Sequence, residues 1–591
     1  MNPSLLVYRF ASAWREGIRK MMQRIFTAIL AAVAAGLFIG AGAARGQDAT
    51  TSKSAPAIIP ATTGVFGLYP GSDFRLTKGV CSDCPVPKQA LWYFRDDLVA
   101  VPAASVKAAE FSRGVVAQED VKRWHAVANG DALQARPPML WIGAPSLVRD
   151  ATLAASGDSI KLSDGASVPF KVTPKIKTNL SFYNDSSKAY FQQRSVRMRG
   201  EMQQESFVAR TMWPQDWAID ETQMTLQPLQ AGESLLGLVR KHANAKDERF
   251  ETRLLWEKSA GVVGKSARDW SGRAVIGVML NGAQGDDDEA HGGHFAIATG
   301  RHARGGEWAD WMVNNFYNLG SFSEKGITAA MLPMDNYLAD VNSGQSWYRP
   351  SYMLVAVLKS DRAAYAYQGA MSRVYHHLYR QDFYYRHATA NCAGISIDTL
   401  RTLGWTIPME GPTSVVKAIA AYPYKSIEDR SFASGKQAYD YMIEEQSRLY
   451  PAAAYDAAGR DLLRIASVMK SAGGSVAAGK LESLLREDLE ALVFVRIPQL
   501  PSSRAFGLFP VASIDEYMKR VPEDKTQWKI VPVGPRPFPK ELIEPDTLKD
   551  EPMSPWSPAL GGFVLIAGLL SIRSIRKRRV RVVAEKHNKN K

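Results

Sequence analysis

The spacing of apolar positions changes along the chain and divides it into three parts. Short apolar runs broken by Gly, Pro and Asp fill residues 58–250, which predicts a mostly-β domain. Strand-like runs followed by two helix-like stretches fill residues 251–410, and helical spacing recurs through residues 411–500. We therefore expect an α+β protein with an N-terminal mostly-β domain, a mixed central domain and a C-terminal helical region.

Beyond the helical region the pattern becomes extended and then apolar. Residues 501–555 are rich in proline, which predicts a semi-rigid stalk. Residues 556–572 carry no charge, and residues 573–591 form a basic tail. A run of this length reaches the lower limit for a membrane-spanning helix, and basic flanks stay cytoplasmic. The pattern predicts a single transmembrane segment with a cytoplasmic tail; a C-terminal sorting tail that is later removed is the alternative.

A second apolar run stands near the N-terminus. Residues 25–40 are almost entirely apolar, follow several basic residues and lead into small residues, so residues 1–46 are expected to be a signal peptide. Translation could begin at Met21 or Met22, and an uncleaved N-terminal anchor is the alternative. Together the two ends predict a periplasmic protein anchored to the inner membrane by its C-terminal segment.

The charge of the 591-residue chain agrees with this division. The formal net charge is +14, but the two ends hold most of it, and the body between residues 25 and 572 carries about +2. This is not a nucleic-acid-binding surface, so no nucleic-acid partner is expected. The sequence contains no P-loop, no GxGxxG motif after a strand and no GxSxG elbow, and no cofactor is predicted.

The three cysteines divide into a close pair and a single residue. Cys81 and Cys84 form the motif CSDC, for which a local disulfide is the favoured interpretation in an exported protein. A redox motif and half of a zinc site are the alternatives. Cys392 then remains as a free thiol.

Cys392 falls in the first turn of a predicted helix. Thr389 or Asn391 can cap this helix, and Gly404 ends it. A helix N-terminus favours the thiolate, so Cys392 is a candidate nucleophile. A buried structural cysteine is the competing interpretation.

A cysteine nucleophile needs an imidazole as its base. His294 opens the strand-like run GHFAIATG, in which small residues share its face. The following run is expected to return as a hairpin with residues near Val313 and Asn314 opposite His294. Asn314 and Asp310 are therefore the candidates to hold the ring in its useful tautomer. A histidine merely packed at a strand end is the alternative.

The segments GHFAIATG, NNFYNLGSF and FYYRHATANCAGISIDTL resemble, in this order, motifs of the periplasmic N-terminal domain of the lipoprotein N-acylating transacylase-like family. The resemblance covers residues 250–410. It implies a circularly permuted, NlpC-type papain-like domain in which histidine precedes cysteine. Carried over by motif, it implies Cys392 as nucleophile and His294 as base, with Asn391, Tyr384 and Tyr385 shaping the substrate site.

The predicted function is a cysteine-dependent amidase, peptidase or acyltransferase that forms a thioester with a cell-envelope peptide, lipoprotein or lipid. One competing hypothesis is metal chemistry at DDDEAHGGH, residues 286–294, where His291 and His294 could act as ligands. The other is a non-catalytic binding or assembly module with a papain-like fold. No metal ion is assigned to the site under the favoured hypothesis.

Overall fold

The computed structural model describes residues 57–106, 111–112, 114–128, 136–174, 183–241, 249–259, 268–284, 291–318, 327–468, 479–513, 516, 519–520 and 537–543. These residues belong to two compact units, one formed by residues 411–445 and the other by the remaining described residues. The predicted signal peptide, residues 1–46, lies outside the described residues, as do the apolar segment 556–572 and the basic tail 573–591.

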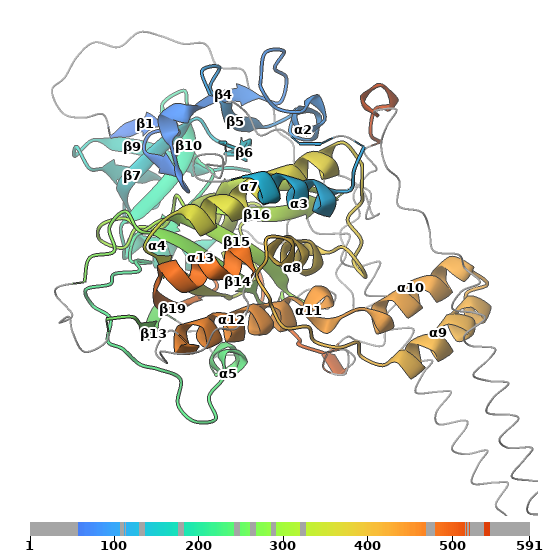
Figure 1. The fold of residues 1–591 in the computed structure, drawn as a ribbon. Coiled ribbons are helices and arrows are strands. Elements are labelled where there is room, and N and C mark those ends of the chain that lie inside the picture. Colours follow the sequence, from blue (N-terminus) through green and yellow to red (C-terminus); the bar gives the residue numbers. More distant parts are fainter. Residues whose placement is uncertain are drawn as a thin grey trace, which may run out of the picture. The chain divides into compact units, whose positions relative to one another are not determined.

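The first sheet of the larger unit has seven strands (Figure 1). Five of them close a ring of pairings, in which β7 pairs β8, β8 pairs β9, β9 pairs β11, β11 pairs β10, and β10 returns to β7. Closing the ring leaves no free edge among these five strands. The seven strands are β1 (Ile58–Pro60), β7 (Ser146–Leu153), β8 (Ser159–Leu162), β9 (Ser167–Val172), β10 (Val196–Gln203), β11 (Ser206–Ala209) and β12 (Trp213–Pro214).

The central sheet has ten strands in the order β13-β19-β18-β14-β15-β16-β17-β6-β5-β4. Strands β14 and β18 are buried along their full length, as their continuous apolar runs AVIGVML and SYMLVAVL require. The strands are β4 (Phe74–Lys78), β5 (Leu98–Pro102), β6 (Leu140–Trp141), β13 (Glu251–Glu257), β14 (Ala274–Asn281), β15 (His294–Arg301), β16 (Met312–Asn318), β17 (Ile327–Pro333), β18 (Ser351–Leu358) and β19 (Leu489–Ile497). A separate small hairpin joins β2 (Val65–Phe66) and β3 (Tyr69–Pro70).

Helices α7, α8 and α12 pack across the middle of the central sheet, where α7 and α12 contact strands β14 and β15 and α8 contacts β15 (Figure 1). Helix α3 packs against α7 and α8, and α13 packs against α7 and α12. The helices of this unit are α2 (Lys88–Tyr93), α3 (Ala117–Val127), α4 (Asp185–Gln192), α5 (Leu235–Arg240), α6 (Met334–Ala339), α7 (Arg362–Tyr379), α8 (Cys392–Thr402), α11 (Gln446–Leu449), α12 (Pro451–Val468) and α13 (Lys480–Asp488), with short 3-10 turns η1 (Gly71–Asp73), η5 (Gln345–Trp347) and η7 (Lys540–Leu542).

The mixed α+β class is as predicted, but the central sheet crosses the predicted domain boundaries. Strands β4, β5 and β6 come from the segment assigned to the mostly-β domain, 58–250. Strand β19 comes from the segment assigned to the helical region, 411–500, and lies between β13 and β18. Apolar spacing indicates a strand but carries no information about its distant pairing partner. The predicted domain boundaries therefore reflect local spacing and not the membership of strands in the sheet.

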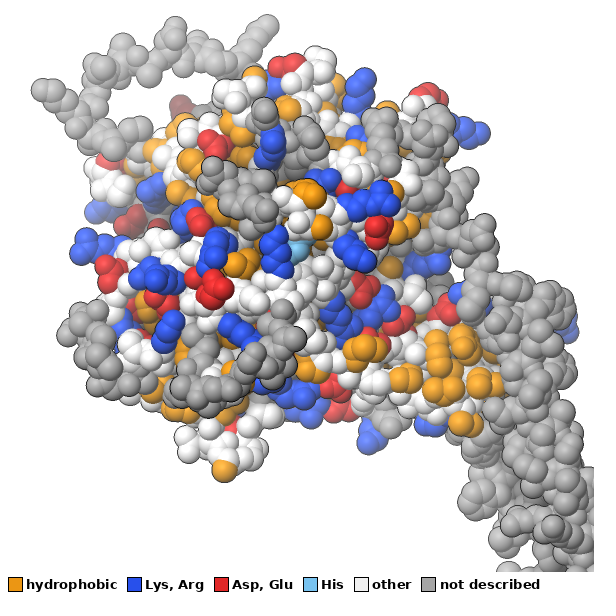
Figure 2. Space-filling view, viewed as in Figure 1, with side chains coloured by type: hydrophobic (Ala, Val, Ile, Leu, Met, Phe, Trp, Pro, Cys, Tyr) orange, Lys and Arg blue, Asp and Glu red, His pale blue; other side chains and the backbone are white. Residues whose placement is uncertain are grey.

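The smaller unit is a helical hairpin of α9 (Val415–Glu428) and α10 (Phe432–Ile443). Ser414 and Ser431 cap the two helices by accepting hydrogen bonds from the backbone N–H groups of Lys417 and Ser434. Apolar side chains gather on the surface formed by these helices (Figure 2). The exposed ones are Val415, Val416, Ile427 and Phe432.

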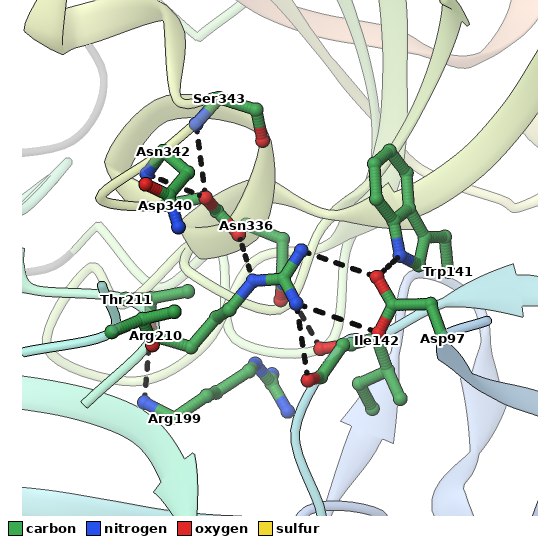
Figure 3. A network of polar contacts seen from close by, with 12 residues as sticks. Asp97, Trp141, Ile142, Arg199, Arg210, Thr211, Asn336, Asp340, Asn342 and Ser343 are labelled. Carbon is green, nitrogen blue, oxygen red and sulfur yellow. Dashed lines mark hydrogen bonds and ion pairs between the residues drawn. The ribbon is translucent and has the colours of Figure 1, made fainter. Parts of the chain in front are cut away.

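Buried arginines from the closed sheet meet carboxylates from the central sheet and its loops (Figure 3). Arg210, which follows β11, donates to Asp340 at 2.7 Å and to Asp97 at 3.2 Å. Trp141 on β6 donates its indole N–H to Asp97 at 2.7 Å. These contacts tie the end of the closed sheet to strands β5 and β6 and to the end of α6.

A second group of ion pairs lies on β10. Arg199 donates to Asp335 at 2.9 Å and to Asp310 at 2.7 Å. Arg197 bonds the same two carboxylates, to Asp335 at 3.2 Å and also to Asp310. Asp335 is fully buried, whereas Asp310 keeps about a quarter of its side chain exposed. We call Arg197, Arg199, Asp310 and Asp335 the arginine–aspartate cluster.

Across the part of the chain that the structure describes, no helix is both long enough and apolar enough to cross a membrane. Helices α7 and α12 each have 18 residues, but they carry charged side chains such as Arg373 on α7 and Asp461 on α12. We therefore correct the prediction of a periplasmic protein anchored by a C-terminal transmembrane segment. The segment on which that prediction depended, residues 556–572, lies outside the described residues.

Candidate active site

Cys392 is the first residue of α8, and its thiol is the free one among the three cysteines. Asn391 caps the helix by accepting a hydrogen bond from the N–H of Gly394 at 2.9 Å. The same side chain donates to the carbonyl oxygens of His387 and Leu449, both at 2.9 Å. Asn391 therefore fixes the start of the helix and the approach to it, and Cys392 is held at 5% exposure.

Three donors surround the sulfur of Cys392. They are the backbone N–H of Phe295, the hydroxyl of Tyr385 and the backbone N–H of Ala393. Burial raises the pKa of the Cys392 thiol, and these donors lower it in part. The predicted effect of the helix N-terminus is thus present in the Ala393 N–H, but burial outweighs it and the resting group is a neutral thiol.

The sulfur lies where two strands of the central sheet separate. Strand β15 pairs β14 over its whole length, from Ala274↔Arg301 to Asn281↔His294. On its other side β15 pairs β16 only at Ala298↔Val313 and Thr299↔Met312. The N–H of Phe295, which lies beyond this short ladder, bonds Cys392 instead of a neighbouring strand.

His294 is brought to the same place, because the N–H that reaches the sulfur belongs to the peptide bond between His294 and Phe295. The His294 Nε2 atom is buried and has no hydrogen-bond partner among the described residues. Burial, with a smaller effect of the charge of Arg349, lowers the pKa of the imidazole to about 3, even though hydrogen bonding with Asn315 raises it in part. The ring is therefore neutral and able to accept a proton.

The predicted partners of His294 were wrong in register. Val313 lies opposite Ala298, not opposite His294, because β16 begins only at Met312. The preceding segment, residues 308–311, is a loop rather than part of the returning strand; Trp308 donates its indole N–H to the carbonyl of Trp217 at 2.7 Å. These tertiary contacts lengthen the connection and shift the strand by four residues.

Asn314 and Asp310 consequently have other roles. Asn314 lies on the opposite face of β16 from Asn315 and accepts a hydrogen bond from the Tyr367 hydroxyl at 2.9 Å. Asp310 belongs to the arginine–aspartate cluster, where it bonds Arg197 and Arg199. The side chain that hydrogen-bonds His294 is Asn315.

The two tyrosines of the predicted substrate site differ in position. Tyr385 accepts a hydrogen bond from the Cys392 N–H at 3.2 Å, and its hydroxyl also bonds the sulfur. Its ring packs against those of Phe316 and His387, with centroids 5.4 and 5.2 Å away. Tyr384 lies beside it in the same loop and is partly exposed. The contact with the thiol comes from Tyr385.

Cys81 and Cys84 form a disulfide with their Cα atoms 5.6 Å apart. Together with Asp83 they are the only group of three potential metal ligands within the described ranges, and their sulfurs are bonded to each other. Most of the acidic run of the alternative metal site, residues 285–290, lies outside the described residues. His291 and His294 are not joined by a third described ligand.

Sequence reasoning missed Phe295, Asn315 and Arg349. Strict alternation from Val313 would have put Asn315, not Asn314, on the face of Ala298 and His294 once the register was known. Arg349 carries no local signal, because it lies in the irregular stretch between η5 and β18. The Phe295 contact uses a backbone N–H, which no side-chain pattern reveals.

Comparison with protein-family models, with curated proteins and with solved structures found no match to this chain. The geometry around Cys392 and His294 is therefore what indicates the function.

Proposed function

We propose that the protein is a cysteine-dependent acyl-transfer enzyme that cleaves an amide or ester through a thioester on Cys392. The observation that carries the proposal is the bond of the Cys392 sulfur with the N–H of the peptide between His294 and Phe295, together with the buried Nε2 atom of that histidine, which has no partner among the described residues. A nucleophile beside an unoccupied base is the arrangement that covalent catalysis requires.

In the proposed reaction Nε2 of His294 takes the proton of the Cys392 thiol as the sulfur attacks the substrate carbonyl carbon. A carbon–sulfur bond forms and the carbonyl electron pair moves onto oxygen. When that pair returns, the bond to the leaving amine or alcohol breaks, and the imidazolium gives its proton to the leaving group. Water or an amine then attacks the thioester with His294 as base, and the thiol is released.

The negative charge that forms on the carbonyl oxygen during attack needs hydrogen-bond donors to stabilise it. The Cys392 N–H and the Tyr385 hydroxyl lie 3.2 Å apart beside the sulfur, and the Phe295 N–H reaches the sulfur from the sheet. Donors arranged before the reaction stabilise such an oxyanion by about 3 kcal/mol each. Tyr385 can serve here because its hydroxyl already bridges the helix N-terminus and the sulfur.

Both reacting groups are neutral at rest. Burial raises the pKa of Cys392 and lowers that of His294 to about 3, so proton transfer is expected to accompany attack on the substrate rather than precede it. The thiol should therefore react more slowly with small electrophiles than an exposed thiolate does.

The finer fold assignment belongs to the same proposal. We infer a circularly permuted papain-like arrangement, in which the nucleophile begins a helix packed on an antiparallel sheet and the histidine strand comes first in the chain. The packing of α8 on β15 and the order of His294 before Cys392 support it. Peptides, lipoproteins and lipids of the cell envelope, the substrates predicted from the sequence, all contain a suitable carbonyl.

The test uses the full chain and a p-nitrophenyl ester as acyl donor. We expect one acyl group on Cys392, found by intact mass and peptide mapping and removed by hydroxylamine. Cys392→Ser should take up none through a thioester, and His294→Gln should react at least about a hundredfold more slowly. His376→Gln is the matched control, since the pKa of that partly buried histidine is likewise lowered to about 3, mainly by desolvation, and it should react like the wild type.

Acylation of other residues alone, or equal rates in wild type and His294→Gln, would contradict the proposal. A Cys392 that stays unmodified until the chain is unfolded would favour the competing hypothesis, a non-catalytic binding module.

A further inference from the structure

We propose that Arg349 is a positioning residue of this site: its fixed positive charge stabilises negative charge on the Cys392 sulfur and keeps His294 neutral until attack. This inference rests on the proposed function and adds a residue to it. Arg349 acts through space on the reacting pair, and no covalent step involves it.

The fold brings Arg349 to the end of the sheet that carries the pair. Its Nη1 donates to the carbonyl of Gly282 at 3.1 Å. Gly282 follows Asn281, the cross-strand partner of His294 in the ladder of β14 and β15. Tyr337 also donates to Asn281 from α6. Arg349, His294 and Tyr337 are therefore gathered around the last residue of β14.

The guanidinium is fixed by a neutral side chain. Nε and Nη2 of Arg349 both donate to Oε1 of Gln345, at 2.9 and 2.6 Å. The segment after β19 covers it, since Ala283 bridges Leu508 and a Cβ on Gly507 would lie 2.7 Å from the Arg349 Cα. Arg349 is consequently 8% exposed, and its field is screened less than that of a surface charge.

The pKa values of three groups at the site change in the direction expected from this one cation. After the larger effect of burial, Arg349 lowers the pKa of His294 and opposes the rise in the pKa of Tyr337. It also lowers the pKa of Cys392, after burial and the three donors. A positive charge stabilises an anion and disfavours a second cation, so all three effects have the sign of one nearby guanidinium.

Charges on the elements packed against α8 are engaged with one another. Arg373 and His377 on α7 both bond Asp120 on α3, Arg448 on α11 bonds Asp398 on α8, and Arg464 bonds Asp461 within α12. The remaining charged or titratable groups on these elements are Glu119, Lys122, Arg123 and His125 on α3, Arg362, His376 and tyrosines on α7, Arg401 on α8, Tyr455, Asp456 and Arg460 on α12, and Arg301 on β15. The charge that affects the pKa of Cys392 is that of Arg349.

The experiment measures the rate at which iodoacetamide alkylates Cys392 across pH, with the site mapped by mass spectrometry. Arg349→Gln should lower the rate at pH 7 by about tenfold and move the pH profile upward, because the thiolate loses its nearby cation. Arg349→Lys should restore most of the rate. Arg504→Gln is the matched control, since Arg504 is also buried and donates to a glutamine, Gln284, at 2.6 Å; it should keep the wild-type profile.

A second variant covers the case in which Arg349→Gln does not fold. Gln345→Glu keeps the acceptor of Arg349 and adds a carboxylate that cancels its charge, so alkylation should again slow and the profile should again move upward. Wild-type profiles in Arg349→Gln and Gln345→Glu would overturn this inference alone. An equal loss in Arg504→Gln would overturn it as well, and an unreactive wild-type Cys392 would instead count against the proposed function.

Discussion

In the arginine–aspartate cluster each charge faces an opposite charge, whereas Cys392 is buried and His294 is partly buried as neutral groups. Arg197 and Arg199 share the carboxylates of Asp335 and Asp310. At the thiol site, by contrast, Nε2 of His294 has no partner among the described residues. The side chains of the cluster bond one another within the fold, while Nε2 of His294 is left without such a bond among the described residues, as are ring nitrogens of other histidines such as His125 and His376. Under the proposed function, the thiol nearby is what distinguishes His294 from those histidines.

The largest expected effect breaks the cluster. Asp335→Asn leaves two buried guanidinium groups with only the partly exposed Asp310 as their counter-charge and should lower the free energy of unfolding by about 3–5 kcal/mol. Asp310→Asn should cost about 1 kcal/mol, because this carboxylate is partly exposed and solvent screens its charge. Urea unfolding followed by tryptophan fluorescence measures both values. Equal losses in the two variants would show that burial does not distinguish the two carboxylates.

A smaller effect concerns pH and the neutral histidine. In the unfolded chain His294 has its ordinary pKa near 6.5, whereas burial lowers the folded value to about 3. Between these values the unfolded chain binds the proton and the folded chain does not, so stability falls as pH decreases. From pH 7.5 to 5.5 one such group contributes a loss of about 1.4 kcal/mol.

His294→Gln should therefore remove about that much of the acid-induced loss, measured as the difference in urea unfolding free energy between pH 7.5 and 5.5. The remaining loss comes from other histidines whose pKa burial also lowers, among them His125 and His376. An acid-induced loss identical in wild type and variant would mean that His294 is not held neutral in the folded protein.

The smallest effect tests the register at the site. Asn315→Ala removes the hydrogen bond to His294 and should slow acylation of Cys392 about tenfold, because the imidazole loses its orienting partner. Asn314→Ala should leave that rate unchanged and lower stability by about 1 kcal/mol, since it removes the acceptor of the Tyr367 hydroxyl. Acylation rates with the p-nitrophenyl ester, set beside urea unfolding, separate the two. A slower rate in Asn314→Ala alone would show that Asn314, the partner predicted from the sequence, orients His294.

Helix capping and strand alternation account for the two elements of the site whose positions were predicted correctly. The helix over residues 392–402 follows from a capping Asn391 at its start and from Gly404, whose backbone is left-handed, after its end. The strand that begins at His294 follows from the alternation of GHFAIATG. Each of these signals lies within a dozen residues, so no knowledge of the fold was needed.

The sequence by itself determined the α+β class, the helix that begins with Cys392 and the strand that begins with His294, because capping and alternation act over short distances. Only the tertiary structure decided which strands share the central sheet, which asparagine meets His294 and how far the thiol is buried. Contacts such as Trp308 with Trp217 and Asp310 with the cluster arginines set the length of the connection to β16. A shift in strand register exchanges the face of every side chain, and such long-range contacts leave no trace in local spacing.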